Sequence, residues 1–268
     1  YSNLADVPRP GHADFTANVK YKGFQDPTGG GHFSGRLTAP LCVAGGIILQ
    51  ILKERGIYIG AHISKISTIC DKLYDPCHVS PQDLKAISGK ELPVLDSEAE
   101  RAMSELILAL KSTGNSIGGV IECAVIGMPA GIGAPIFDGL ENRISQCVFG
   151  IPAIKGIEFG AGFDVAEMTG AENNDDFYFD TDGSIKTATN NHGGILGGIS
   201  SGMPLIFRVA VKPTPSIGLE QSSVCIPSKE NTKLTVKGRH DPCILPRAVP
   251  CVEAAAAIAI YDMICDNI

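Results

Sequence analysis

The chain has 268 residues, of which 44% are hydrophobic and 19% charged, and this composition excludes an intrinsically disordered protein and predicts a sizeable core. A formal net charge of −7 without a long basic run argues against nucleic acid as a partner, although local arginines can still bind an anionic substrate. No run reaches about 18 uninterrupted apolar residues, so no membrane span is expected, and nine cysteines, several within apolar runs, predict reduced thiols in a cytoplasmic protein.

Hydrophobic periodicity and capping residues predict a mixture of helices and strands. Residues 1–37 are rich in proline and glycine and predict loops. Further along the chain we predict a buried helix at 39–55, a strand at 57–66, a short capped helix from Ser80, an amphipathic helix at 97–113 capped by Ser97, a strand at 116–129, a helix at 140–150, a strand at 153–160, an irregular polar stretch at 164–192, a strand at 204–212 and a buried C-terminal helix from Ala248. Because strands and helices do not alternate strictly, a plain doubly wound fold is not expected.

Two glycine-rich segments have backbones that could approach a ligand. GGGHFSG, residues 29–35, offers amides that could line an anion, although composition alone favours an ordinary tight loop. HGGILGGISSGMP, residues 192–204, could lie flat against a planar ligand or form a turn between strands. Cys70, Cys77 and His78 lack a second metal-binding pair, so no metal site is predicted.

Three polar turns carry groups suited to anion binding and proton transfer. KPTPS, residues 212–216, places a lysine and two hydroxyls on a proline-stiffened turn, which suits a phosphate but also an ordinary surface turn. GRHDPC, residues 238–243, holds a carboxylate that could relay a proton or form a loop salt bridge. RPGHAD, residues 9–14, supplies a histidine that titrates near neutrality, although a lone loop histidine is usually solvated.

Taken as an ordered set, these segments are far more specific than any one of them. RPGHADFTANVKY, GGGHFSGR, SIGGVIECAVIGMPAGIG, IPAIKGIEFGAGF, NNHGGILGGISSGMP, VAVKPTPSI and GRHDPCILPRAVP follow one another in this order. Together they resemble the chorismate synthase family over essentially the whole chain. The family's GESHG segment, which carries its other active-site histidine, does not occur here, so we expect a single domain over 1–268 that is incomplete at its N-terminus.

The resemblance implies a fold and a reaction. The fold would be α+β, a β-α-β sandwich with helices between two antiparallel sheets, assembled as a homotetramer. The reaction would be that of a lyase of the shikimate pathway and aromatic amino acid biosynthesis: 1,4-elimination of phosphate from 5-enolpyruvylshikimate 3-phosphate to give chorismate, with reduced FMN and no net redox change. An external flavin reductase and NADP belong to the associated chemistry. The alternatives are a flavin-dependent oxidoreductase and a non-catalytic flavin-binding fragment.

The resemblance also assigns roles by position. His12 matches the histidine that protonates reduced flavin, Asp241 matches an aspartate that relays a proton near flavin N5, and Arg9 and Arg36 match arginines at the substrate. The matched flavin-binding positions are His32, Phe33, Ser34, Pro152, Ala153, Gly197, Lys212, Pro213, Thr214, Pro215, Ser216 and Arg239. Two of them depart from the family pattern: His32 replaces an arginine by a titratable group, and Pro152 removes an amide side chain and a backbone N–H.

Overall fold

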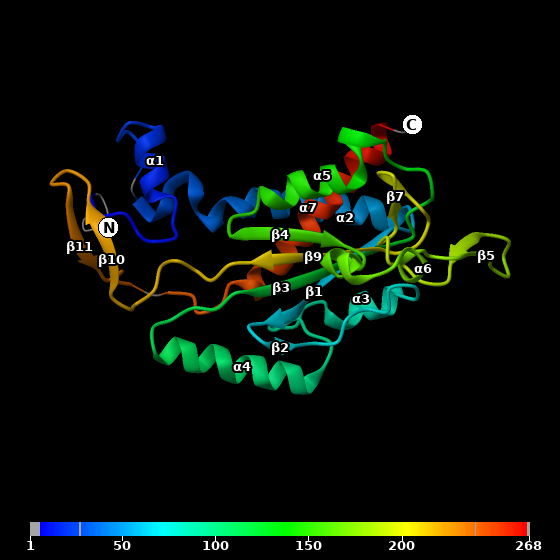
Figure 1. Cartoon of the computed structure of the whole chain (residues 1–268), viewed down its shortest axis with the longest axis horizontal. Helices are drawn as coiled ribbons and strands as arrows, with labels where there is room; N and C mark the ends of the chain where they lie inside the picture. Colours follow the sequence, from blue (N-terminus) through cyan, green and yellow to red (C-terminus); the bar gives the residue numbers. More distant parts are fainter. Residues whose placement is uncertain (1–5, 27, 239, 267–268) are drawn as a thin grey trace.

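A five-stranded antiparallel sheet forms the centre of the computed structural model, which describes residues 6–26, 28–238 and 240–266 (Figure 1). The strand order is β2-β1-β3-β9-β4. The strands are β1 (Tyr58–Ile66), β2 (Ile69–Cys70), β3 (Gly119–Ile126), β4 (Ile154–Phe159) and β9 (Leu205–Val211). Since every neighbouring pair is antiparallel, the expectation against a doubly wound fold is confirmed, and so is the α+β class.

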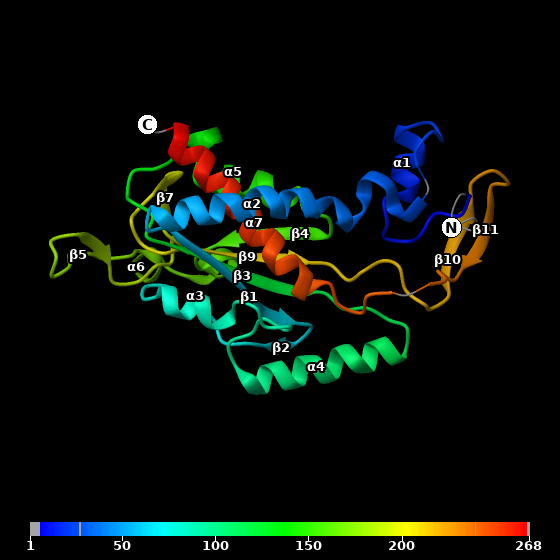
Figure 2. The same ribbon diagram turned by 180° about the vertical axis from the view of Figure 1, so that it is seen from behind.

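Helices cover both faces of this sheet (Figures 1 and 2). On one face, α7 (Leu245–Asp266) packs on β1 and β3, α5 (Leu140–Phe149) lies beside it next to β4, and α2 (Thr38–Glu54) packs against α7. On the other face, α3 (Pro81–Ile87) packs on β1, while α4 (Ser97–Ser112) contacts β2. The two-residue strand β2 was not predicted from the sequence. The other helices and strands were predicted to within a few residues, α3 from its capping residue Ser80 and the longer elements from their hydrophobic patterns.

The close contact of α2 with α7 depends on small side chains. Residues 254–257 of α7 are all alanine and all at most 1% exposed. A methyl group on Gly45 of α2 would lie 2.3 Å from Cβ and 2.5 Å from Cα of Ala254, so only glycine allows the two helices to approach this closely. By length and hydropathy alone, segments 35–54 and 245–266 would each suffice to cross a membrane, and a buried core helix such as α7 passes the same test.

Short elements occupy the stretches in which the sequence predicted only loops and turns. Few residues contribute to each, so no periodicity reveals them. They are α1 (Asp14–Lys20), η2 (Thr28–Phe33), η3 (Gly35–Leu37), η4 (Ile136–Asp138), η5 (Gly162–Glu167), α6 (Gly170–Asn173) and the hairpins β5 (Phe177–Phe179) with β6 (Ile185–Thr187), β7 (Ile195–Leu196) with β8 (Ile199–Ser200) and β10 (Gln221–Cys225) with β11 (Glu230–Leu234). The described residues thus form one large sheet and three two-stranded hairpins.

Two helix starts differ from the prediction. The N-cap of α4 is Asp96, not Ser97: its Oδ1 accepts hydrogen bonds from the backbone N–H groups of Glu98 at 2.7 Å and Ala99 at 3.4 Å, and Ser97 is the first helical residue. The C-terminal helix begins at Leu245, three residues before the predicted start, and continues through Pro250. Pro250 is the sixth residue of this helix, beyond the four N–H groups that have no intrahelical acceptor, so α7 lacks one backbone hydrogen bond at this position.

Candidate active site

A cavity of about 640 Å³ lies where the N-terminal loop, the start of α2, the turn after β9 and the approach to α7 meet. This size suits a small-molecule ligand, since such pockets measure roughly 300–1,000 Å³. Seven residues assigned from the sequence line it: Arg9, Ser34, Arg36, Pro152, Thr214, Ser216 and Asp241. The fold therefore gathers residues from both ends of the chain into one concave site.

Cationic side chains predominate in the cavity wall. Arg9, Arg36, Lys237 and Arg247 line it, against one carboxylate, Asp241. Arg247 Nη1 pairs with Asp241 Oδ2 at 2.5 Å, although the Arg247 side chain itself is 77% exposed. Lys237 and Arg247 were not among the predicted site residues, although Arg247 lies in the GRHDPCILPRAVP segment. Arg9 is paired with Asp14 and Arg247 with Asp241, so Arg36 and Lys237 contribute most to the net positive charge that favours an anionic ligand.

His12 is held by a carboxylate two residues along the chain. Its Nδ1 lies 2.6 Å from Asp14 Oδ1, and the guanidinium of Arg9 donates to both oxygens of Asp14 at 2.8 and 2.9 Å. Burial disfavours the Asp14 carboxylate, but the hydrogen bonds from Arg9 and His12 outweigh this effect and hold the pKa of Asp14 well below its usual range. Asp14 therefore stays ionised, accepts the Nδ1–H of His12 and directs Nε2 towards Gly30. The role of Asp14 is visible only in the structure.

The KPTPS turn packs beneath the RPGHAD loop. Lys212 Nζ donates to the carbonyl of Gly11, and the Oγ of Ser216 accepts from Arg9 Nη1 at 3.2 Å. Burial, with Lys155 nearby, lowers the pKa of Lys212. Thr214 Oγ1 is buried and has no hydrogen-bond partner among the described residues, although Thr214 lines the cavity. A buried hydroxyl without a partner is costly, so this group is available to a ligand.

Pro152 brings strained backbone to the cavity wall. The next residue, Ala153, has φ +77°, a left-handed conformation that is unusual for a side chain with a Cβ. The carbonyl of Ala153 accepts from the backbone N–H of Lys212 at 2.9 Å, which holds this turn against the end of β9. Such outliers concentrate at functional sites.

The remaining assigned residues do not line the cavity. His32 and Phe33 are exposed at the end of η2, next to Ser34, whose Oγ accepts from Arg36 Nε at 3.1 Å. Ala153, Lys212, Pro213 and Pro215 belong to the turns behind the wall, and Arg239 lies outside the described residues. Gly197 is in the exposed β7–β8 turn, at the opposite end of the sheet from α1 (Figures 1 and 2).

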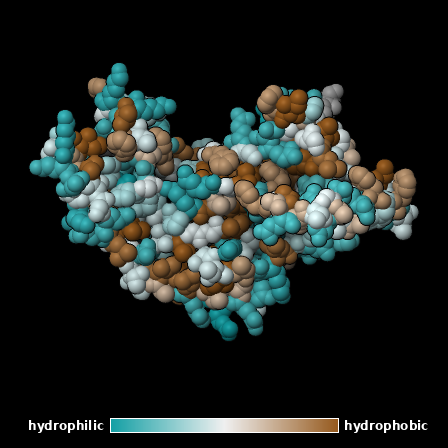
Figure 3. Space-filling view, viewed as in Figure 1, coloured by the Kyte–Doolittle hydropathy of each residue, from teal (hydrophilic) through white to brown (hydrophobic). Residues whose placement is uncertain are grey.

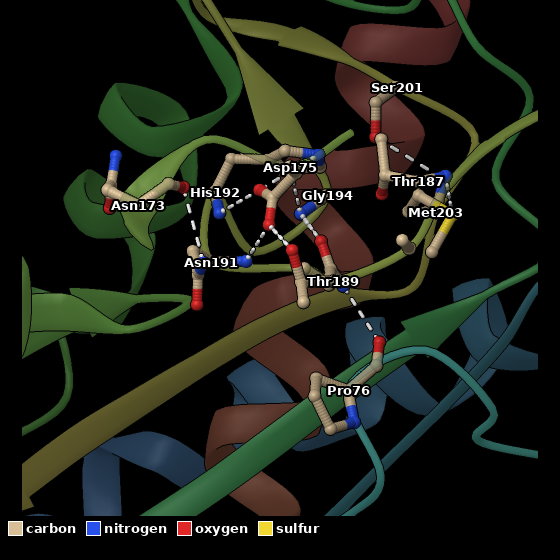
Figure 4. Close-up of polar contacts among 12 residues, drawn as sticks. Pro76, Asn173, Asp175, Thr187, Thr189, Asn191, His192, Gly194, Ser201 and Met203 are labelled. Carbon is tan, nitrogen blue, oxygen red and sulfur yellow. Dashed lines mark hydrogen bonds and ion pairs between the residues drawn. The ribbon is translucent and has the colours of Figure 1, made fainter. Parts of the chain in front are cut away.

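The glycine-rich segment before Gly197 is a folded turn held by Asp175 (Figure 4). Asp175 accepts the backbone N–H groups of Asn191 at 2.8 Å and His192 at 3.0 Å, and His192 Nδ1 accepts the N–H of Gly194 at 2.9 Å. Burial lowers the pKa of His192 despite the neighbouring carboxylate. A neutral imidazole that accepts a backbone hydrogen bond acts structurally, so among the described contacts this segment behaves as a turn between strands.

Comparison with known proteins identifies the family. The sequence profile described as chorismate synthase matches residues 1–265. The chain belongs to the chorismate synthase family. The chorismate synthase of Lancefieldella parvula is 52% identical over 273 residues, which cover 98% of this chain and 71% of the relative. That of Thermococcus kodakarensis is 42% identical with the same coverage of both.

A solved structure agrees with this family assignment. A crystal structure of chorismate synthase matches with a TM-score of 0.76 at 28% identity, covering 95% of this chain and 70% of that chain. The predicted membership of the chorismate synthase family, and with it of a class of lyases in the shikimate pathway, is confirmed. The roles of individual residues in the cavity stay predictions.

Proposed function

We propose that this protein converts 5-enolpyruvylshikimate 3-phosphate to chorismate and phosphate by a 1,4-elimination with reduced FMN and without net redox change. The observation that carries the proposal is the cavity lined by Arg9, Arg36, Lys237 and Arg247. The proposed substrate bears two carboxylates and a phosphate, and guanidinium groups bind such anions with paired charge-assisted hydrogen bonds. Family membership supplies the reaction class.

The residues present fit a flavin cofactor. Thr214 Oγ1 is a buried hydroxyl in the wall without a hydrogen-bond partner among the described residues, and Ser34 and Ser216 line the same wall. Together with the backbone at Pro152, they would hold the cofactor against the cationic side of the cavity. When bound, reduced FMN supplies electron density to the departing phosphate and accepts the ring hydrogen.

Two side chains of this protein, His12 and Asp241, would take part in proton transfer. Because Asp14 fixes the Nδ1–H of His12, Nε2 is the atom that exchanges a proton with the bound ligand. His12 does not itself line the cavity, but its Nε2 faces Gly30 in η2, and Gly30 lies close to Ser34 in the cavity wall. Asp241 would accept or pass a proton within the cavity, since its carboxylate belongs to the cavity lining.

The decisive test is an anaerobic assay of the protein, with any residues that flank this chain in nature, using chemically reduced FMN and substrate. Chorismate should form over many turnovers while the flavin absorbance shows no net oxidation. Product formed in step with flavin oxidation would instead indicate an oxidoreductase. Binding of FMN without any chorismate would indicate a flavin-binding protein that is not catalytic, and either result would overturn the proposal.

We also propose a homotetramer in the cytoplasm that receives its reduced flavin from a separate reductase. All nine cysteines are free, as expected in a reducing compartment. Phe177 and Phe179 of the β5–β6 hairpin are 67% and 76% exposed, and Figure 3 shows hydrophobic surface at this end of the molecule. Exposed apolar patches mark interaction surfaces. Light scattering should give a tetramer, and Phe179→Ser should shift the mass towards smaller species.

A further inference from the structure

Two cysteines meet beside the cavity. Cys42 lies on α2 and Cys251 on α7, and their sulfur atoms are 3.7 Å apart, although 209 positions separate them in the sequence. Cys251 belongs to the cavity lining, and Cys42 is half-buried. Neither thiol has a part in the proposed elimination.

The helix crossing makes this pair suitable for a disulfide. Because a methyl group on Gly45 would lie 2.5 Å from Cα of Ala254, the Cα atoms of these two residues are within about 4 Å, allowing one bond length of about 1.5 Å. Cys42 and Cys251 each lie three residues before this contact, on the same two helices. An S–S bond measures about 2.0 Å, so the sulfurs need to approach by about 1.7 Å from their present distance.

We propose that Cys42 and Cys251 are a redox-active dithiol that hydrogen peroxide converts to a disulfide linking α2 to α7 at the cavity wall. In the first step peroxide oxidises the sulfur of Cys251 to a sulfenic acid and is reduced to water. In the second step the sulfur of Cys42 attacks that sulfur, the S–S bond forms, the S–O bond breaks, and the hydroxyl leaves as water with the proton of Cys42. Two thiols and one peroxide thus give one disulfide and two waters.

The local environment sets the pH dependence of the second step. Burial and the neighbouring Cys251 raise the pKa of Cys42 to about 11, so this thiol is protonated at neutral pH. Attack by a thiolate is far faster than attack by a thiol. Cross-linking should therefore accelerate as the pH rises from 7 to 9. The link ties the start of α2, which follows Arg36, to the helix that carries Arg247.

The experiment treats the folded protein with peroxide at pH 7 and pH 9, blocks the remaining thiols with an alkylating reagent and maps the peptides without reduction. A peptide linking Cys42 to Cys251 should appear, and sooner at pH 9. Cys42→Ser and Cys251→Ser should each abolish it, whereas Cys265→Ser, which removes an exposed thiol on the same helix, should leave it unchanged. The linked protein should melt at a higher temperature until dithiothreitol is added, because the bond closes a very long loop.

Two results would overturn the proposal. One is peroxide treatment that oxidises exposed cysteines such as Cys70 and Cys265 while both Cys42 and Cys251 remain alkylatable after mild denaturation. The other is a Cys42–Cys251 link that forms as fast in urea-unfolded protein as in folded protein, since the crossing of α2 and α7 would then have no part in it. Circular dichroism of each serine variant shows whether the fold is retained.

Discussion

His62 of β1 and Glu122 of β3 form a buried pair, with Nε2 of the imidazole 2.9 Å from Oε2 of the carboxylate. The other ring nitrogen lies 3.1 Å from Asp71 Oδ2. Asp71 also accepts the backbone N–H groups of Leu95 and Asp96, so the pair anchors the chain on either side of α3 to the centre of the sheet. The ring of Tyr74 packs edge-on against His62 at 4.7 Å.

This pair makes stability depend on pH. Burial disfavours the imidazolium, but the hydrogen bonds to Asp71 and Glu122 outweigh it and raise the pKa of His62 above 6.5. Because the pKa is higher in the folded protein, the stabilisation is complete below 6.5 and is lost as the pH rises through the folded-state value. The free energy of unfolding in urea should therefore fall as the pH rises above 6.5.

Substitution of His62 tests this assignment. His62→Gln should cost about 3–5 kcal/mol at pH 6, since it leaves buried carboxylates without their cation. The variant should also have a flatter pH profile than the parent. His78→Gln is the matched control, because His78 pairs with Asp75 at the exposed surface and should change little. Equal pH profiles for the parent and His62→Gln would assign the pH dependence to other groups.

Glu253 of α7 should destabilise the protein at high pH. Burial raises its pKa to about 7, although its carboxylate accepts the backbone N–H of Ala61 at 2.9 Å. The protonated carboxyl is tolerated in the core, so the protein keeps its full stability below the ordinary pKa of 4.5. The free energy of unfolding falls as the pH rises through about 7. Glu253→Gln keeps the hydrogen-bond acceptor and removes the charge, so it should stabilise by about 1–3 kcal/mol at pH 8. At pH 4.5 the substitution should change the free energy of unfolding little. A change of the same size and sign at pH 4.5 and at pH 8 would contradict this account.

Gly45 should tolerate no side chain. Gly45→Ala places a methyl group 2.3 Å from Cβ of Ala254, so α2 and α7 must separate, at a cost of about 1–3 kcal/mol or more. Gly46→Ala is the control: nothing lies within 4 Å of its methyl group, and alanine favours the helix by about 1 kcal/mol. Thermal unfolding should thus move in opposite directions for two neighbouring residues. If the unfolding temperature moved in the same direction for both variants, α2 and α7 could separate enough to accommodate the methyl group at little cost.

His12 should be needed for turnover and not for folding. His12→Ala should lower chorismate formation under saturating reduced FMN by roughly 10²–10⁴-fold, the usual contribution of a general acid or base. Asp14→Asn should lower it less, because it weakens the orientation of the ring without removing Nε2. Unchanged turnover in His12→Ala would remove this residue from the mechanism.

Thr214 should bind the cofactor. Thr214→Val removes a buried hydroxyl that lacks a partner among the described residues, so the ligand-free protein should be as stable as the parent or slightly more stable. Affinity for FMN, measured by fluorescence titration, should fall about tenfold, since one hydrogen bond to a charged group contributes about 1.5 kcal/mol or more. Unchanged affinity with raised stability would place the flavin elsewhere in the cavity.

The sequence by itself determined the long elements and the family. Helices α4 and α5 and strand β9 follow from hydrophobic patterns that their own residues carry, and seven ordered segments carried the resemblance to chorismate synthase. Local patterns failed at α1 and the short hairpins, where too few residues repeat, and at Asp96, which caps a helix where Ser97 was expected.

Only the tertiary structure decided which of these residues meet. That Arg9 and Asp241 share one cavity, that Gly197 does not line it, and that Cys42 faces Cys251 all depend on contacts between segments far apart in the chain. Such contacts are fixed by how closely elements can pack, as at Gly45 and Ala254, and by which buried polar groups find partners. Hydrophobic periodicity gives neither the packing distance between two elements nor the partner of a buried polar group. It describes which side of an element is buried and not what lies opposite that side.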